Sequence, residues 1–315
     1  MAQPTGTFSS YDAVGNREDL SDMVYNISPT KTPVLTAIGK KKATNRDHQH
    51  QKESLTAAAS NAHIEGDDAS PVAPAATTLV SNYTQILKKH AVVTGTQEDG
   101  MNPAGRDSEM AHQIANRMVE MKRDLELALV GLNNAKVAGN DTTARELGSL
   151  QAYLTSNTSA GATGADPTGN GVDARTDGTQ RAFTEALLTP VLQSCFDNGG
   201  DPNLMVVGSF NKGVVSGFDG GQTRYADTSD KQLVASIDVY VGDFHTLQVV
   251  ADHFSRSRDA LLIETDKLKL ADMRKIHAYD LAKTGDSYRR EIVWETTLEV
   301  CNEAAHGIVA DLLTS

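Results

Sequence analysis

The sequence predicts an elongated α+β protein, and three long patterns support this prediction. A strand-like stretch, Arg289 to Cys301, spans roughly 40 Å at about 3.3 Å per residue. A helical stretch, 108–138, spans roughly 45 Å at about 1.5 Å per residue. A polar stretch, 43–97, has strand-like segments on both sides of its centre. Elongated bodies of this kind are typical of proteins that contact neighbouring copies or partners.

Residues 1–42 predict an extended arm. A short helical hint at 17–20 is followed by two prolines, Pro29 and Pro33, and each proline biases the residue before it away from helix. A free terminus is held in place only by what it contacts. We therefore expect the arm to lie against another subunit. Its expected contact residues are Arg17, Glu18 and Asp19.

Residues 43–97 predict a long two-stranded hairpin that projects from the body. Its strands are expected within 47–55 and 79–96. The stretch between them, 57–76, is rich in alanine, contains two prolines and has no large apolar run with which to form its own core. An isolated two-stranded hairpin is marginal in water, so this one needs a partner surface. Its acidic residues, Glu65, Asp67 and Asp68, are expected contacts.

A long helix and the C-terminal strand are expected to run side by side as the spine of one domain, formed by 98–140 and 264–315. Between 108 and 138, apolar residues recur every three or four positions, which is the spacing of one helix face. Asn102-Pro103 is a start signal and Gly139-Asn140 a stop signal. The strand places its apolar residues mostly on one face and its acidic residues on the other. The apolar positions are Ile292, Trp294, Leu298 and Val300, and the opposite positions are Arg289, Glu291, Glu295, Thr297 and Glu299.

Residues 141–263 predict a second, compact portion. The glycine-rich stretch at 155–180 is expected to be a surface loop or a linker. The elements expected after it are a helix at 183–196 kinked at Pro190, a strand at 204–207, a short helix at 211–218, a hairpin of 236–241 with 246–251, and a strand at 261–263.

Composition excludes several classes of protein. The chain has 315 residues, of which 39% are hydrophobic and 22% charged, and no run of it matches a spanning helix. The N-terminal sequence has no basic and apolar leader pattern, so secretion is not expected. The net charge of −12 opposes tight binding to a phosphate backbone. Cys195 and Cys301 are far apart and are expected to be reduced thiols in packed positions.

Motifs for chemistry are missing from the sequence. His48 and His50 share one strand face and His63 follows, but no further ligands complete a zinc set, so exposed loop residues are favoured over a metal site. The acids at 291, 295 and 299 are expected to form a solvated or subunit-facing surface rather than a general-acid site. We predict no catalytic residues, no cofactor and no metal.

Motifs at the two ends and in the middle of the chain resemble those of one family, the podophage-type major head (capsid) proteins of tailed double-stranded-DNA phages. They lie at 15–22, 25–30, 32–33 and Gly39, at 201–202, Val206 and 209–212, and at 281–286, Glu295, 297–300, 302–303 and 305–307. The resemblance runs nearly from end to end, except at 57–74 and 155–180.

The resemblance implies an α+β fold of the Hong Kong 97 type. Its parts would be an N-terminal arm (1–42), an extended E-loop hairpin (43–97), a peripheral domain with a spine helix (98–140 and 264–315) and an axial domain (141–263). The implied function is a structural capsid subunit that assembles with itself into pentamers and hexamers of a virion shell. Such a shell encloses DNA without reading its sequence, is assembled in the host cytoplasm, and works with portal, scaffolding or decoration proteins. No membrane partner is implied.

The resemblance also implies a contact between neighbouring capsomers at the turn 284–287. Charges of both signs surround this turn, which suits reciprocal pairs between copies; a solvated turn is the alternative. The expected contact residues are Lys283, Asp286, Arg289, Arg290 and Glu291. Two other readings of the whole chain stay open: a soluble enzyme or ligand-binding protein that uses 181–263, and a head-decoration protein, which the length and the order of parts disfavour.

Overall fold

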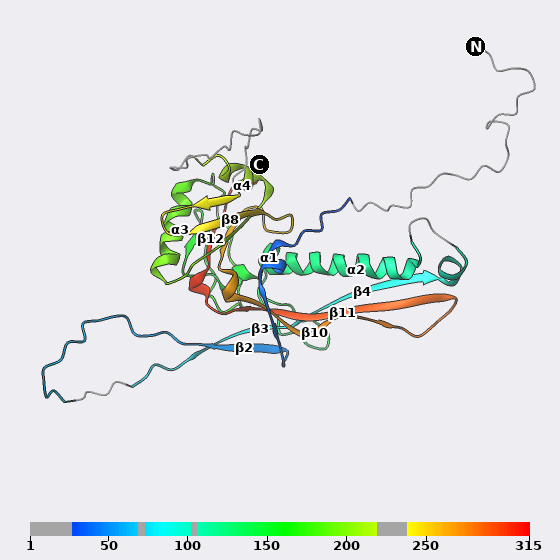
Figure 1. Ribbon diagram of the computed structural model, residues 1–315, viewed down its shortest axis with the longest axis horizontal. Helices are drawn as coiled ribbons and strands as arrows, with labels where there is room; N and C mark the ends of the chain where they lie inside the picture. Colours follow the sequence, from blue (N-terminus) through cyan, green and yellow to red (C-terminus); the bar gives the residue numbers. More distant parts are fainter. Residues whose placement is uncertain (1–26, 69–72, 102–105, 219–237) are drawn as a thin grey trace, which may run out of the picture.

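The computed structural model describes residues 27–68, 73–101, 106–218 and 238–315. The molecule is elongated, with a compact lobe between a long projecting hairpin on one side and a long sheet and helix on the other (Figure 1). The helices are α1 (Pro33–Ala37), α2 (Glu109–Glu126), α3 (Glu185–Asp197) and α4 (Ser209–Val215). The strands are β1 (Gly39–Lys42), β2 (Asp47–Lys52), β3 (Thr78–Tyr83), β4 (Gln85–Thr94), β5 (Thr158–Ser159), β6 (Leu204–Val207), β7 (Val239–Val241), β8 (Thr246–Ala251), β9 (Ala260–Ile263), β10 (Leu268–Asp280), β11 (Ser287–Val300) and β12 (Gly307–Val309).

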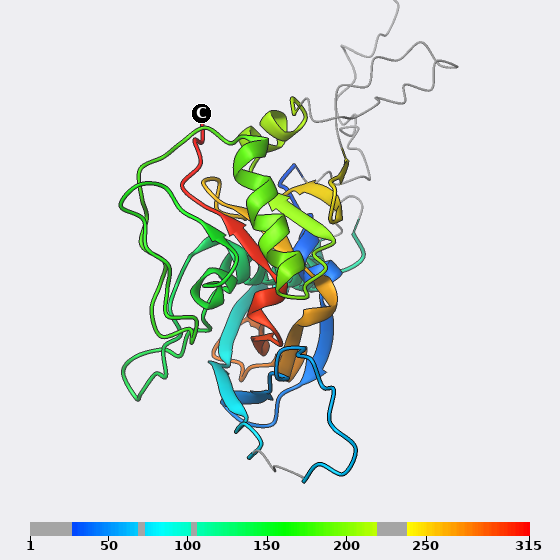
Figure 2. The same cartoon turned by 90° about the vertical axis from the view of Figure 1, so that its left-hand side faces the viewer.

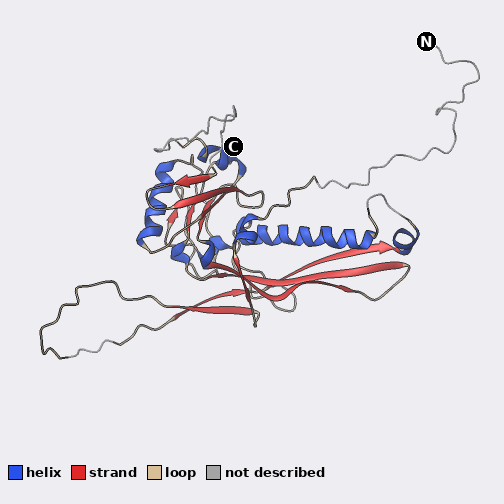
Figure 3. Cartoon of the chain, viewed as in Figure 1, coloured by secondary structure: helices blue, strands red, loops and turns tan. Residues whose placement is uncertain are grey.

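A four-stranded sheet and one long helix form the elongated half. The strand order is β1-β10-β11-β4, with β1 parallel to β10 and the other pairs antiparallel. Helix α2 lies along one face of this sheet, mainly over β4 (Figure 3). The apolar face of β11 supplies Ile292, Trp294 and Leu298 to the core on the α2 side, which confirms the predicted alternation. The strand spans 14 residues, close to the predicted length.

The compact lobe is built on a six-stranded sheet with the order β5-β12-β9-β6-β8-β7. The predicted helix through Pro190, buried strand, short helix and hairpin are all present, as α3, β6, α4 and β7–β8. Helix α3 contains Pro190 and buries Leu188, Val191, Leu192 and Cys195 against the sheet. The lobe therefore has its own apolar cluster.

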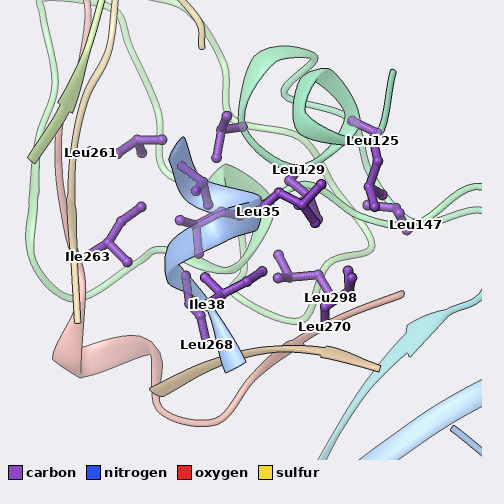
Figure 4. Close-up of a cluster of buried hydrophobic side chains, with 14 of the residues drawn as sticks. Leu35, Ile38, Leu125, Leu129, Leu147, Leu261, Ile263, Leu268, Leu270 and Leu298 are labelled. Atoms are coloured by element: carbon purple, nitrogen blue, oxygen red, sulfur yellow. The ribbon is translucent and has the colours of Figure 1, made fainter. Parts of the chain in front are cut away.

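The largest apolar core joins the two halves. Leu35 and Ile38 come from the α1 segment, Leu125 and Leu129 from the end of α2, and further leucines from both sheets (Figure 4). The last ten residues of the predicted arm are therefore part of the body, because 33–37 form α1 and 39–42 pair with β10. Pro33 begins this helix, where proline is tolerated since the first helical N–H has no partner within the helix. The predicted arm residues 1–26 lie outside the described part of the chain.

Two predicted boundaries were wrong. The hairpin consists of β2 and β3 only, since β4 pairs with β11 inside the four-stranded sheet. The α-helix ends at Glu126 and continues as a π-helical turn, Leu127–Gly131, instead of reaching residue 138. A side chain at Gly131 would meet the carbonyl oxygen of Phe254, and Asn133 has a φ of 51°, so the chain turns away here.

The glycine-rich stretch at 155–180 is an ordered part of the lobe and does not act as a linker. It lies along one side of the lobe (Figure 2) and contains β5 and an antiparallel bridge between Ala165 and Thr176. The carboxylate of Asp311 accepts hydrogen bonds from the backbone N–H groups of Gly161 (2.9 Å) and Gly178 (2.8 Å), at the two ends of this stretch. These hydrogen bonds fasten the stretch to the C-terminal segment.

Candidate intersubunit interface

The hairpin loop exposes its acidic residues fully. Every described residue of 53–77 is exposed, including two large apolar side chains, Leu55 (93%) and Ile64 (84%). Glu65, Asp67 and Asp68 lie at the far end of this loop, and Asp67 is 3.3 Å from the ring of His63. Apolar side chains exposed to this degree favour a surface that is covered in an assembly.

The base of the hairpin, in contrast, is fastened to β11 by Glu299, which is 4% exposed. Its carboxylate oxygens lie 2.5 Å from Nε2 of His48 on β2 and 3.0 Å from Nζ of Lys41 on β1. The hydrogen bond from His48, followed by that from Lys41, lowers the pKa of Glu299 to about 2 although burial opposes ionisation. The carboxylate therefore stays charged and holds two strands against β11.

The other two glutamates of the same strand face are also buried and paired within the chain, so the prediction of a solvated or subunit-facing surface was wrong. Glu295 is 3% exposed and is hydrogen-bonded by Arg145 (2.7 Å) and Arg274 (2.7 Å). Glu291 is 8% exposed, accepts from the hydroxyl of Tyr279 and is 3.3 Å from Nζ of Lys88. Alternation along a strand places these acids on one face, but it does not reveal what covers that face.

The predicted contact turn lies at the end of the β10–β11 hairpin, far from the compact lobe (Figure 1). The ammonium group of Lys283 lies 4.2 Å from the ring centre of Tyr288, and Arg290 is paired with Asp280 at 2.6 Å. Arg289 is half-buried and donates to Ser287. Asp286 is joined to the end of β4 through its carbonyl oxygen, which accepts from the N–H of Gly95.

The turn borders a cleft of about 530 Å³ between the β10–β11 tip and the start of α2. Its lining includes Lys283, Arg289 and Arg290 on one side and Glu98 and Asp99 on the other. The structure thus brings together three of the five turn residues predicted as contacts at this cleft. Asp286 lies in the turn but does not line the cleft, and Glu291 contacts Lys88 and Tyr279 on the sheet. The three arm residues predicted as contacts, Arg17, Glu18 and Asp19, lie outside the described residues.

Sequence reasoning missed two buried acids that organise the structure. Asp311 fastens the 155–180 stretch, and Glu126 accepts backbone hydrogen bonds from α1. The available signal for Asp311 was a single acid within the apolar run of residues 308–313. Glu126 occupies a position next to Leu125 on the apolar helix face, where an isolated acid implies a buried partner.

Groups for metal binding do not gather in the described ranges. Across 27–68, 73–101, 106–218 and 238–315, no set of three His, Cys, Asp or Glu side chains could hold a metal ion. His48 lies on β2, is buried and contacts Glu299, so the expectation of an exposed loop residue was wrong for it. His63 is exposed in the hairpin loop, and both cysteines are free thiols as predicted. Among the helices formed by these residues, none has the length and apolarity needed to cross a membrane.

Comparisons with known proteins agree with this geometry. The chain matches the SU10 major capsid protein family over residues 3–313. It is 34% identical over 131 residues to the major capsid protein of Escherichia phage Phieco32, an alignment that covers 41% of this chain and 37% of that protein. The chain therefore spans well under half the length of this curated relative.

Solved structures share the fold at low sequence identity. The capsid of cyanophage A-1(L) has a TM-score of 0.64 at 14% identity and covers 98% of this chain and 99% of its own. The capsid of a native GTA particle has a TM-score of 0.62 at 12% identity, covering 96% and 98%. A structure from Mycobacterium phage Cain has a TM-score of 0.60 at 13% identity, covering 98% and 100%. The chain has the Hong Kong 97-type capsid fold and belongs to the SU10 major capsid protein family, a structural family rather than an enzymatic one.

Proposed function

We propose that this chain is the repeating subunit of a phage head, arranged as pentamers and hexamers in a closed shell around double-stranded DNA. The observation that carries the proposal is the hairpin loop 53–77, whose described residues are all exposed while its base is fastened by a buried ion pair. A loop held at one end and uncovered at the other is suited to lie on a neighbouring copy. The charge of −12 fits a wall that encloses DNA without adhering to it.

The proposed division of labour follows the fold. The residues before α1 act as an arm that reaches a neighbour through Arg17, Glu18 and Asp19. The hairpin formed by β2 and β3 reaches another neighbour through Glu65, Asp67 and Asp68. The peripheral domain, 98–140 with 264–315, carries the tip at which neighbouring capsomers meet. The axial domain, 141–263, supports the contacts within each capsomer.

The tip is proposed as the contact between capsomers. Its charges of both signs favour this role, since Lys283, Arg289 and Arg290 line an open cleft together with Glu98 and Asp99. Asp286 belongs to the same proposed contact, whereas Glu291 is left out of it because it is buried and paired within the chain. Portal, scaffolding or decoration proteins are further proposed partners, and the host cytoplasm is the proposed place of assembly.

Hydrogen exchange on particles and on free subunits tests the proposal. We expect amides of 53–77 to exchange at least tenfold more slowly in particles, because a neighbour covers them, and the two states should be separated by electron microscopy beforehand. The hairpin base, 47–52, is the matched internal control, because its antiparallel pairing with β3 exists in the free subunit too. Equal exchange of 53–77 in both states, or purified material that never forms particles, would contradict the proposal.

A further inference from the structure

Glu126 is the only described residue of its α-helix that combines a charge with complete burial. It is the last residue of α2 and is 0% exposed. Its two carboxylate oxygens accept hydrogen bonds from the backbone N–H groups of Val34 (2.7 Å) and Leu35 (2.8 Å), at the start of α1. A side chain of the spine helix thus satisfies donors of the segment that leads into the N-terminal arm.

Among the described residues, no compensating cation acts on Glu126: burial, two backbone hydrogen bonds and a second carboxylate are what shift its pKa. Helix α1 carries no charged side chain. The titratable group that faces it from the lobe is another carboxylate, Asp252, which is 4% exposed and lies next to His253. Arg123, one turn earlier on α2, lies over the ring of Phe254 instead.

Burial therefore dominates the titration of Glu126. The loss of water raises its pKa to about 7 from the ordinary 4.5, and Asp252 acts in the same direction. The hydrogen bonds from Val34 and Leu35 act in the opposite direction and are too few to offset the burial.

Three parts of the molecule meet at this residue. The α1 segment buries Val34, Leu35 and Ile38 in the shared core. The π-helical turn that follows Glu126 accepts a hydrogen bond at Val130 from the N–H of Arg256 in the lobe. A rearrangement of α1 would therefore change contacts of both the spine helix and the lobe, close to Glu126.

We propose that Glu126 is a proton-sensitive latch that holds the root of the N-terminal arm against the spine helix, tight when its carboxyl is neutral and loose when it is charged. While α1 is docked, the carboxyl group is shut off from water. When α1 moves away, water reaches the group and favours its charged form. Deprotonation therefore shifts the equilibrium toward the released arm root, and the effect belongs to the single subunit, independent of shell formation.

The sign and the window of the effect follow from linkage. The docked state has a pKa of about 7, and a hydrated glutamate has the ordinary value of 4.5. Protons are thus bound preferentially by the docked state between these two values, and the latch loosens as the pH rises through this window and levels off above it. Because one proton is involved, the equilibrium constant for release of α1 rises by at most about tenfold per pH unit.

Hydrogen exchange of free subunits from pH 5 to pH 8 measures the latch directly, with each rate corrected for the intrinsic pH dependence of exchange. In the wild type, we expect the protection of peptides that contain Val34 and Leu35 to fall by on the order of tenfold or more between pH 5 and pH 7 and then to level off. Glu126→Gln keeps the shape and removes the titrating group, so its protection should be independent of pH over this range.

Two matched variants separate the latch from general effects. Glu120→Gln, on the same helix but partly exposed and near Lys89, should retain the wild-type slope. In Asp252→Asn, the protection should still fall with rising pH, but it should level off at a lower pH, because the pKa of Glu126 is no longer raised by the charge of Asp252. Wild-type protection that does not change between pH 5 and pH 7 would overturn the proposal by itself, even if a variant failed to fold. A slope that survives in Glu126→Gln would overturn it as well.

Discussion

The base of the hairpin and the root of the arm are each held by one buried glutamate, but the two carboxylates have opposite surroundings. Glu299 is 4% exposed and Glu126 is 0% exposed, so both are nearly cut off from solvent, but Glu126 lies deeper inside the protein. Glu299 has Lys41 and His48 as partners and a pKa lowered to about 2, whereas Glu126 has two backbone N–H donors and a pKa raised to about 7. Depth and partners together decide whether a buried acid is charged at neutral pH: burial dominates at Glu126, and the hydrogen bond from His48 dominates at Glu299.

This difference has a structural consequence. A charged, ion-paired carboxylate is costly to undo, because each partner would be left without its counter-charge. A carboxyl group whose pKa is near the ambient pH gains or loses its proton readily, and this changes which conformation of the protein it favours. The hairpin base is thus built as a permanent attachment, and the arm root, by our proposal, as an adjustable one.

Removal of the charge at the hairpin base should have the largest effect on the subunit. Glu299→Gln removes the negative charge and replaces one of the two acceptor oxygens by an NH2 donor. We therefore expect a loss of about 2–4 kcal/mol of unfolding free energy, below the upper range for buried pairs because Lys41 is half exposed. Denaturant titration at pH 7 measures this loss. Glu65→Gln in the exposed loop is the control and should stay within about 0.5 kcal/mol. A similar small effect for Glu299→Gln would show that the pair does not fasten the hairpin.

Acidification should affect the two attachments in opposite directions. The lowered pKa of Glu299 means that its contribution is complete above about 4.5 and is lost as the pH falls through about 2. The raised pKa of Glu126 means that the arm root tightens as the pH falls from about 7 to about 4.5. Exchange of the segments 47–52 and 33–38 at pH 7, 5 and 3 compares them. The comparison fails if both segments change together over the whole range.

Charge reversal at the tip should have the smallest effect on the subunit and a visible effect on assembly. The pair between Arg290 and Asp280 is exposed, so the double variant Arg289→Glu with Arg290→Glu should change the unfolding free energy by about 0–1 kcal/mol. Shell yield should nevertheless fall and become more sensitive to salt. The double lysine variant at the same positions keeps the charge and serves as control. Unchanged yield at low and high salt would mean that the tip is only a solvated turn.

Periodicity predicted the regular elements well. The alternation in β11, the repeat in α2, and the strand, helix and hairpin of the lobe were all found at or near their predicted positions. These patterns depend on neighbours in sequence, since a strand or a helix face is defined within ten or twenty residues. The family resemblance supplied the arrangement of these parts, which periodicity alone does not give.

The buried acids could not be predicted because their partners are distant in sequence. His48 meets Glu299 across 251 positions, and Val34 meets Glu126 across 92. For this reason, the acidic residues of one β11 face are buried in ion pairs with distant residues. Likewise, the glycine-rich stretch 155–180 is ordered by hydrogen bonds to Asp311. The end of α2 was missed for the same reason, since the close approach of Gly131 to Phe254 is a tertiary contact.

The strand order of the four-stranded sheet also bears on how the chain folds. Its two edge strands, β1 and β4, come early in the sequence, and they do not pair with each other but with the central strands β10 and β11. The two central strands, β10 and β11, begin only at Leu268 and Ser287. During synthesis, the sheet that covers the apolar face of α2 therefore cannot form until β10 and β11 have been made, near the end of the chain. Such distant pairing slows folding and leaves apolar surface exposed in the meantime. The nascent chain is thus expected to depend on chaperones until β11 has left the ribosome.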